Sequence, residues 1–415
     1  MSGQWQDVSD VKSQPLLQQA LSDLQFGDFQ QQWEATKILN RMGNAAIQPL
    51  ITILEDVETD PEVQWFVARS LGQFETQEVI NALVSSLQRT HHDSDSDEQA
   101  GVQQMIGVAL GNLGKSAITP LTDLLKTESL RRLATEALAQ IRQVETIPAL
   151  LQVSQDSDPQ VRAVAIEALG SFHDPRVPPV LLNALQDTHA AIRKEAIAAL
   201  GVRGDLQTQL NLVKQLKPLL WDIRAEVSQQ AQIALARLGT DEAAAALFEQ
   251  IQATPTPMSL KRDGVRALAW IETPVSLNYL SEIFQQAQGW ETEKNTQFPL
   301  SQEIVRMLGR VNSSELKPKA TEILVGLLNR SEIATQSVQM QQLIASALGQ
   351  LGQPQAMDAL IQLLSTANTG VQLHCIAALK QLNAQSAHQR LTHLSRQADL
   401  PLLLKNGIDI ALAEW

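Results

Sequence analysis

The stretch PEVQWFVARSLGQF, residues 61–74, brings together side chains that could hold a ligand. Trp65 and Phe66 are adjacent aromatic residues in a chain that is only 4% aromatic. Arg69 follows one helical turn later, and its guanidinium can form paired hydrogen bonds with a carboxylate. We therefore predict a contact surface formed by Trp65, Phe66 and Arg69. The alternative is that the two aromatic rings only pack against a neighbouring helix.

Cys375 is the only cysteine, so the chain cannot form an intrachain disulfide or a site with several cysteine ligands. It shares an apolar helical face with Val371 and Leu379, where a cysteine behaves as a small hydrophobe. His374 is adjacent and is expected to be more exposed. The sequence shows no GxxxxGK[ST] loop and no Ser/His/Asp arrangement that can be placed together. The catalytic residues are therefore unknown, and a non-enzymatic role is favoured.

The segment THHDSDSDEQ, residues 90–99, resembles part of a calcium-binding loop. Its three aspartates have the alternating spacing of such a loop: Asp93, Asp95 and Asp97. However, Glu98 and Gln104 occupy the positions where the loop requires glycine and glutamate. We interpret residues 89–100 as a solvated acidic insertion and predict no metal site, with weak binding by the histidines and aspartates as the alternative.

The charge balance excludes two classes of partner. The chain has 32 basic and 45 acidic residues and a formal net charge of −13, whereas nucleic-acid and anionic-membrane binders need a positive surface. No apolar run reaches the roughly 18 residues of a membrane helix, and the first residues lack the order of a secretion signal. We therefore expect a cytoplasmic protein that binds neither nucleic acid nor the membrane interior.

A repeated motif must position these residues. Three segments, which begin at Leu130, Val161 and Ile192, share one pattern: an apolar residue at the start, a small or apolar residue four positions later and Leu eight positions later. Their starts are 31 residues apart. Similar segments occur along the whole chain. Their starts are Gln31, Val63, Val102, Leu130, Val161, Ile192, Val227, Leu260, Leu300, Met340 and Val371. Residues at the start, +4 and +8 lie on one helical face, which predicts a buried stripe.

A second amphipathic segment precedes each of these helices, so each repeat is predicted to be a helical hairpin. The turns Asp60-Pro61 and Asp158-Pro159 are typical helix starts, because Asp caps the free N–H groups and Pro suits the first position. A glycine after +8, as at Gly72, is expected to form a left-handed cap that ends the second helix. Strand patterns are absent.

The landmarks Asp-Pro-x-Val-Arg and Ala-Leu-Gly favour the HEAT type of repeat. A tetratricopeptide array would need many tyrosines, and Tyr279 is the only one. We therefore predict an all-α fold, a right-handed α-solenoid of about eleven HEAT-like helical hairpins with capping helices at the ends.

The predicted boundaries follow from the repeat. Residues 1–13 form a disordered N-terminus, residues 14–383 form the solenoid, and residues 384–415 form C-terminal capping helices. Besides the acidic insertion, longer loops are predicted at 286–299 and 310–318. Trp290 and Phe298 lie in the first of these loops, where an exposed aromatic ring could anchor a partner; the alternative is that Trp290 folds back onto its hairpin.

The segment DPQVRAVAIEALGSFHDPRVPPVLLNAL, residues 158–185, resembles the short HEAT-like repeat of the phycobilisome lyase family, which is related to the E/F-type bilin lyases of cyanobacteria. The resemblance covers about residues 15–383. In the lyases, the helix that corresponds to residues 63–72 carries two aromatic pairs that line a bilin-holding cleft. Trp65 and Phe66 match the first pair, whereas Arg69 and Ser70 replace the second.

Two functions from different classes follow. The leading one is a non-enzymatic scaffold or assembly factor without a cofactor, which binds a protein such as a phycobiliprotein subunit or another photosynthetic assembly component. The resemblance implies the alternative, a phycobilin lyase, isomerase or chromophore-handling chaperone. Trp65 and Phe66 would then stack on the phycobilin and Arg69 would bind its propionate. A third interpretation is a docking role in iron–sulfur or photosystem assembly.

Overall fold

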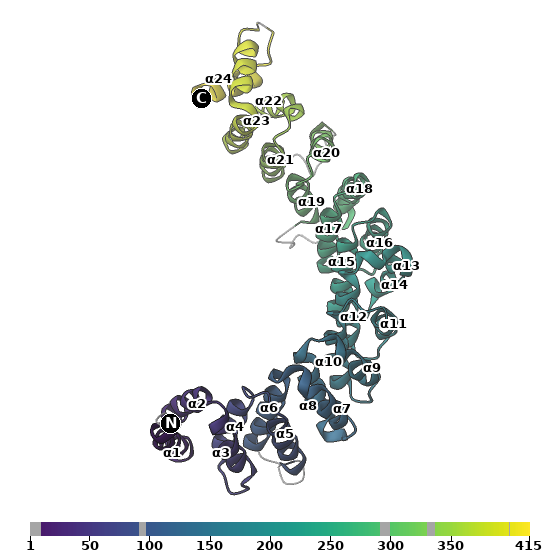
Figure 1. Ribbon diagram of the computed structural model, residues 1–415. Coiled ribbons are helices and arrows are strands. Elements are labelled where there is room, and N and C mark those ends of the chain that lie inside the picture. Colours follow the sequence, from purple (N-terminus) through teal and green to yellow (C-terminus); the bar gives the residue numbers. More distant parts are fainter. Residues whose placement is uncertain (1–9, 91–96, 291–298, 330–336, 398) are drawn as a thin grey trace, which may run out of the picture. The chain divides into compact units, whose positions relative to one another are not determined.

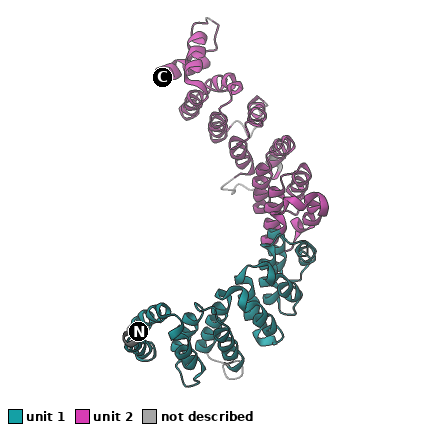
Figure 2. Cartoon of the chain, in the orientation of Figure 1, with its two compact units in different colours: residues 1–199 teal, residues 200–415 magenta. Residues whose placement is uncertain are grey.

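A computed structural model describes residues 10–90, 97–290, 299–329, 337–397 and 399–415, and within these ranges it contains helices and no strand (Figure 1). The helices follow one another as hairpins whose second helices contact each other in sequence, which confirms the predicted all-α solenoid. Helix contacts divide the chain into two compact units, residues 1–199 and residues 200–415 (Figure 2). The division lies near the end of α12, inside the segment that the sequence analysis treats as one solenoid.

Unit 1 consists of six hairpins. They are α1 (Asp10–Phe26) with α2 (Phe29–Met42), α3 (Asn44–Glu55) with α4 (Pro61–Leu71), α5 (Gln77–Thr90) with α6 (Asp97–Asn112), α7 (Ile118–Leu124) with α8 (Glu128–Ile141), α9 (Ile147–Val153) with α10 (Pro159–Gly170), and α11 (Val177–Ala184) with α12 (Ala190–Gly201). The even-numbered helices are the second helices of these hairpins.

Unit 2 continues the pattern with one irregular hairpin. Its helices are α13 (Gln207–Leu210) and α14 (Leu212–Leu216) before α15 (Ala225–Leu238), α16 (Asp241–Gln252) with α17 (Met258–Ile271), α18 (Pro274–Trp290) with α19 (Leu300–Gly309), α20 (Lys317–Asn329) with α21 (Val338–Leu351), α22 (Met357–Leu363) with α23 (Thr369–Ser395), and α24 (Leu402–Ala413). Asn211, with φ 50°, separates α13 from α14, because Asn tolerates this left-handed conformation.

The predicted buried stripe holds the second helices together. Every predicted repeat start lies in a helix of the described ranges, and in ten of the eleven repeats the start, +4 and +8 residues are all buried. The exception is Gln31, which is exposed because its side chain forms a capping box with Asp28. The predicted Asp caps are also present: Asp60 accepts from the amide of Glu62 and Asp158 accepts from that of Gln160, both at 2.8 Å.

The expectation of a left-handed cap at Gly72 is wrong. Gly72 has φ −62° and ψ 0°. Positive φ values among the described glycines occur at Gly43, Gly114, Gly239 and Gly352. The glycine after +8 therefore has another physical role.

That role is close approach between neighbouring second helices. A Cβ atom added to Gly72 would lie 2.9 Å from Ala109 Cα, and one added to Gly309 would lie 2.7 Å from Ala347 Cβ. Gly170, Gly201 and Gly349 meet an alanine of the next second helix in the same way. Each such pair is a Gly–Ala notch, in which the missing side chain lets the two backbones pack closely.

Arginine–aspartate pairs connect successive hairpins of unit 1. Arg131 donates to Asp156 at 2.9 Å, and Arg162 makes a two-point contact with Asp187 at 2.8 and 3.0 Å. Burial of Asp187 raises its pKa, but hydrogen bonds from the Arg162 side chain and the His189 amide outweigh this effect and hold the pKa below its usual value. Each pair thus joins a second helix to the turn that starts the next one.

Described helices extend into the segments predicted as inserted loops. Helices α5 and α6 occupy residues 89–90 and 97–100, and α18 continues to Trp290. The segment predicted as a loop at 310–318 is held against the end of α17. The Glu272 carboxylate accepts hydrogen bonds from the backbone N–H groups of Asn312 and Ser313, at 2.9 and 3.0 Å. The long spacing of these repeats comes partly from long first helices, with 17 residues in α18 and 13 in α20 against 7 in α7.

The two ends differ from the repeats. Helix α1 begins at Asp10, inside the segment predicted to be disordered, and residues 1–9 lie outside the described residues. Helix α23 bends at Asn383, whose side chain accepts from the Ser386 amide at 2.9 Å. Helix α24 then packs against α23, and the Trp415 ring lies 5.8 Å from the His388 ring. The bend coincides with the boundary that the sequence analysis places at 383.

Candidate functional site

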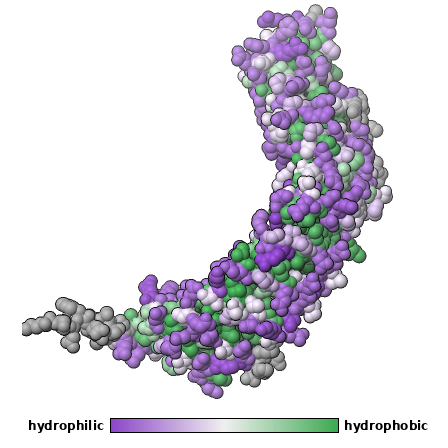
Figure 3. Space-filling model, turned by 45° about the vertical axis from the view of Figure 1, so that its right-hand side comes forward, coloured by the Kyte–Doolittle hydropathy of each residue, from purple (hydrophilic) through white to green (hydrophobic). Residues whose placement is uncertain are grey.

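The surface of the molecule is mostly hydrophilic, and hydrophobic residues reach it in small groups on the face that Figure 3 shows. Helix α4 carries Trp65, Phe66 and Arg69, and the structure gives these three residues different environments. Phe66 is fully buried, Trp65 is half-buried and Arg69 is exposed. The predicted surface contact is therefore possible for Trp65 and Arg69, whereas Phe66 belongs to the core.

Helix α2 completes an aromatic cluster around Phe66. The ring centroid of Phe66 lies 5.4 Å from Phe29, 6.5 Å from Trp33 and 5.2 Å from Trp65, in each case with an edge-to-face orientation. Such edge-to-face pairs add about 0.5–1.5 kcal/mol beyond the burial of their area. Phe29 is 61% exposed, whereas Phe66 is fully buried. The cluster therefore exposes one apolar ring to solvent and is anchored in the core by Phe66.

Arg69 lies against the two indoles of this cluster. Its guanidinium carbon is 4.7 Å from the centre of the Trp33 ring and 5.7 Å from that of Trp65, within the range of cation–π attraction. No ion pair holds Arg69 to an acidic residue in the described part of the chain. The Arg69 guanidinium therefore links α4 to α2 through its cation–π contact with Trp33.

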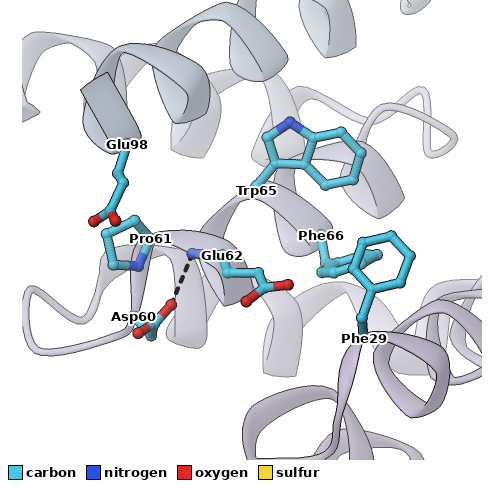
Figure 4. Close-up of a pocket in the computed structure, with 7 residues that line it drawn as sticks. All are labelled: Phe29, Asp60, Pro61, Glu62, Trp65, Phe66 and Glu98. Carbon is cyan, nitrogen blue, oxygen red and sulfur yellow. Dashed lines mark hydrogen bonds between the residues drawn. The ribbon is translucent and has the colours of Figure 1, made fainter. Parts of the chain in front are cut away.

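A pocket of about 430 Å³ opens beside the cluster, and we refer to it as the acidic pocket (Figure 4). It is lined by Phe29, Asp60, Pro61, Glu62, Trp65, Phe66 and Glu98. The Asp60 carboxylate caps α4, as the dashed line in Figure 4 marks. Glu62 and Glu98 are exposed, and their carboxylates have no described partner. Arg69 does not line the pocket, so all the charged side chains there are acidic.

These lining residues determine which kind of ligand the acidic pocket can bind. A Lys or Arg side chain would meet carboxylates and could place its cationic group against Trp65 or Phe29. A carboxylate ligand such as a propionate would instead be repelled by Glu62 and Glu98. The sequence analysis missed Phe29, Trp33 and Glu98. The spacing of Phe29 and Trp33, four residues apart at the start of a second helix, is a signal that could have identified the first two.

Trp290 lies at the end of α18 and is half-buried. Its ring centre is 4.1 Å from the Lys261 ammonium, which also donates to the backbone carbonyls of Ile251 and Ala253. Burial lowers the pKa of Lys261. Trp290 thus contacts α17 of the preceding hairpin, and its part in partner binding stays a prediction. Phe298, the other predicted anchor, lies outside the described residues.

Cys375 is buried with Val371 and Leu379, as the repeat pattern predicts. Burial raises its pKa to about 12, which keeps the thiol protonated and unreactive. The Nδ1 atom of His374 donates to the Gly370 carbonyl oxygen at 2.8 Å. Among the residues that the structure describes, no cluster of three His, Cys, Asp or Glu side chains is arranged to hold a metal ion. Asp93 and Asp95 are not among them.

None of the described helices combines the length and the apolar character needed to cross a membrane.

Two family models match the sequence. The model described as HEAT repeats matches residues 13–100, 147–224 and 327–405. The model described as PBS lyase HEAT-like repeat matches residues 130–156. No curated protein matches the chain.

Solved structures of karyopherins share the fold. Kap121p is 15% identical with a TM-score of 0.58, and the match covers 97% of this chain and 49% of Kap121p. Kap95p, in a structure that describes its binding to RanGDP, is 13% identical with a TM-score of 0.55, covering 96% of this chain and 60% of that one. Importin beta is 12% identical with a TM-score of 0.51, covering 96% and 61%. The chain therefore spans about half to three fifths of these structures.

Proposed function

Because the chain belongs to the HEAT-repeat family, we propose that it is a non-enzymatic scaffold that binds another protein along its second helices. Its fold resembles that of karyopherins, and one of these, Kap95p, binds the protein RanGDP. Repeat solenoids bind through extended surfaces, because each hairpin presents its second helix in the same register as its neighbours.

The acidic pocket is the proposed contact on unit 1. One observation carries the proposal: exposed Phe29 and half-buried Trp65 stand beside two carboxylates, Glu62 and Glu98, that no described residue neutralises. Aromatic rings supply contact area at little cost in side-chain entropy, and the carboxylates select a cation. We therefore expect the partner to insert a Lys or Arg side chain next to an apolar one.

A peptide selection tests this site. The whole chain would be used to select binders from a random peptide library, and the affinities of the resynthesised peptides would be measured by calorimetry. We expect enriched peptides to combine a basic with an apolar residue. Substituting both Glu62→Gln and Glu98→Gln should weaken their binding by about tenfold or more, since a desolvated charge pair is lost.

Two controls accompany the selection. Glu128→Gln removes an exposed carboxylate from the first turn of α8 and should leave the affinity unchanged. Trp65→Ala should weaken peptide binding, with the thermal midpoint measured in parallel. Loss of stability with full affinity would show that Trp65 only packs against its neighbours, and the proposed contact would then be abandoned.

A second candidate is the handling of a phycobilin for phycobiliprotein subunits, and the match of residues 130–156 to a PBS lyase HEAT-like repeat supports it. Against it stand the burial of Phe66 and the carboxylates beside Trp65. Coexpression with a bilin-synthesis pathway, with and without phycobiliprotein subunits, separates the candidates. Bilin absorbance on this chain, or bilin attached to a subunit only in its presence, would favour this second function; colourless products would favour the scaffold.

A further inference from the structure

Unit 2 carries an exposed tryptophan that the proposed site does not involve. Trp270, in the last turn of α17, is 68% exposed, against 42% for Trp221, and the other described tryptophans are less exposed than either. A ring of this size in water is unfavourable unless a partner covers it. No ring or cation contact with this indole occurs within the described residues.

Two hollows flank Trp270, and both are lined by second helices of unit 2. On one side a hollow of about 350 Å³ includes Ile233 and Ala236 of α15. On the other, a hollow of about 580 Å³ includes Arg306, Met307 and Arg310 at α19. We call these two hollows, with Trp270 between them, the Trp270 groove.

The carboxylates of the Trp270 groove are already used within the chain. Glu303 is buried and accepts from Arg266 at 2.6 Å, and it also pairs with Arg306 at 3.5 Å. Glu272 accepts hydrogen bonds from the backbone N–H groups of Asn312 and Ser313. Asp263 accepts from Gln229 at 2.9 Å and pairs with Arg266 at 3.4 Å. The carboxylates therefore hold the groove in shape and are not free to bind a cation.

The second helices on either side of α17 each carry an arginine without an ion pair in the described ranges. In the register of the repeats, Trp270 is the +10 residue of its second helix, and the +10 residues of the two neighbouring second helices are Arg237 and Arg310. Both are exposed and form no ion pair in the part of the chain that the structure describes. Arg310 lines the hollow on the α19 side, and the repeat register puts Arg237 at the equivalent position of α15, in a chain whose net charge is −13.

We propose that the Trp270 groove binds an acidic segment of a partner protein, with an apolar side chain on Trp270 and a carboxylate on each of Arg237 and Arg310. Packed helices lie about 8–10 Å apart, so the two arginines are about 20 Å apart along the row. An extended chain rises about 3.4 Å per residue, which places the two acidic residues about six positions apart. The apolar residue would be near the middle.

The experiment is a second peptide selection, made on the full chain with Glu62→Gln and Glu98→Gln to disable the site on unit 1. We expect enriched peptides with two acidic residues about six apart and an apolar residue between them. Trp270→Ala, and separately Arg237→Gln with Arg310→Gln, should each weaken binding by about tenfold or more. All three side chains are exposed, so circular dichroism should be unchanged.

The control substitutions are Trp221→Ala and Arg224→Gln, which alter an exposed tryptophan and an exposed arginine of the same unit outside the groove and should leave the affinity unchanged. The inference is overturned if the enriched peptides are basic or lack the apolar residue. It is also overturned if Trp270→Ala binds them normally, or if single-stranded DNA of equal charge competes as well as the peptide. Since both free carboxylates of the acidic pocket are neutralised throughout, these outcomes do not depend on that pocket.

Discussion

At the scale of single residues, the Gly–Ala notch gives the sharpest test of how the repeats pack. In Gly309→Ala the new Cβ would lie 2.7 Å from Ala347 Cβ and 2.9 Å from its Cα, so helix α19 has to move away from α21. We expect a loss of about 1–3 kcal/mol in the free energy of unfolding, the usual cost of overpacking. Urea unfolding followed by circular dichroism measures it.

Gly326→Ala is the matched control, because Gly326 also lies inside a helix of unit 2 but its Cβ would meet no atom within 4 Å. Alanine there should stabilise the protein by up to about 1 kcal/mol, through helix propensity and reduced freedom of the unfolded chain. Equal effects at the two glycines would mean that close approach is not the reason for Gly309.

Cys375 allows a test of burial by chemistry. Its thiol is fully buried and its pKa is raised to about 12, so Ellman's reagent at neutral pH should not react with the native protein. In urea the single cysteine should react fully and rapidly. Fast reaction of the native protein would contradict the position of Cys375 on the buried stripe.

The pair of Arg162 and Asp187 gives a prediction about pH. The pKa of Asp187 is lower in the folded chain than in the unfolded one, so the pair stabilises above the unfolded value of about 3.9, and this contribution disappears as the pH falls through the folded value. Asp187→Asn should reduce the unfolding free energy by about 1–3 kcal/mol at pH 7. As the pH falls from about 4 through the folded pKa of Asp187, the variant and the parent should converge.

Urea unfolding at a series of pH values measures this difference. Asp123→Asn serves as the control, since Asp123 forms an exposed pair with Lys126 and such pairs contribute about 0–1 kcal/mol. A cost for Asp187→Asn that does not change between neutral and acidic pH would show that the charge of Asp187 is not what stabilises the pair.

At the scale of elements, the sequence predicts the second helices well and their surroundings less well. The stripe from Val63 through Val67 to Leu71 identifies α4 because burial depends on local periodicity. The local pattern predicts a left-handed cap at Gly72, which is wrong. Gly72 is needed because it packs against Ala109, and Ala109 lies in the next repeat, so a pattern within one repeat does not predict this contact. The insertion boundaries were misplaced for a different reason: polar residues in α18 and α20 look like loop residues until their helices are seen.

The candidate site was only partly predictable for the same reason. Position +2 of the repeat placed Trp65 near the surface, and +6 placed Arg69 there. Phe66 at +3 is buried because Phe29 and Trp33 of the preceding second helix cover it, and that contact depends on how α2 packs against α4. Glu98 reaches the acidic pocket from α6, so its role requires the stacking of a third repeat.

Leu169 tests packing within one element. It is the +8 residue of α10 and fully buried, so Leu169→Ala should lower the unfolding free energy by about 2–5 kcal/mol through lost contacts and the cavity left behind. Leu16→Ala, at a half-exposed leucine of α1, should change it by less than about 0.5 kcal/mol. Similar losses at both positions would contradict the assignment of the core.

At the scale of the whole molecule, the division into units near residue 199 predicts how the chain unfolds. Each hairpin contacts mainly its neighbours, so a defect should spread through the unit that contains it before it reaches the other. In Leu169→Ala, hydrogen exchange followed by mass spectrometry should accelerate in α8 and α10 and stay unchanged in α19 and α21. Uniform acceleration over both units would show that the chain unfolds as one cooperative block.

The Gly–Ala notches also bear on how such a chain can change its length during evolution. A second helix such as α19 supplies the glycine for the following repeat, and α21 supplies both the alanine that fits it and a glycine, Gly349, for the repeat after that. A duplicated hairpin would therefore carry both the alanine and the glycine, and it could pack against the hairpin before it and the hairpin after it. Loss of one whole hairpin would remove one glycine and one alanine together, so the gain or loss of complete hairpins is the path that the packing permits.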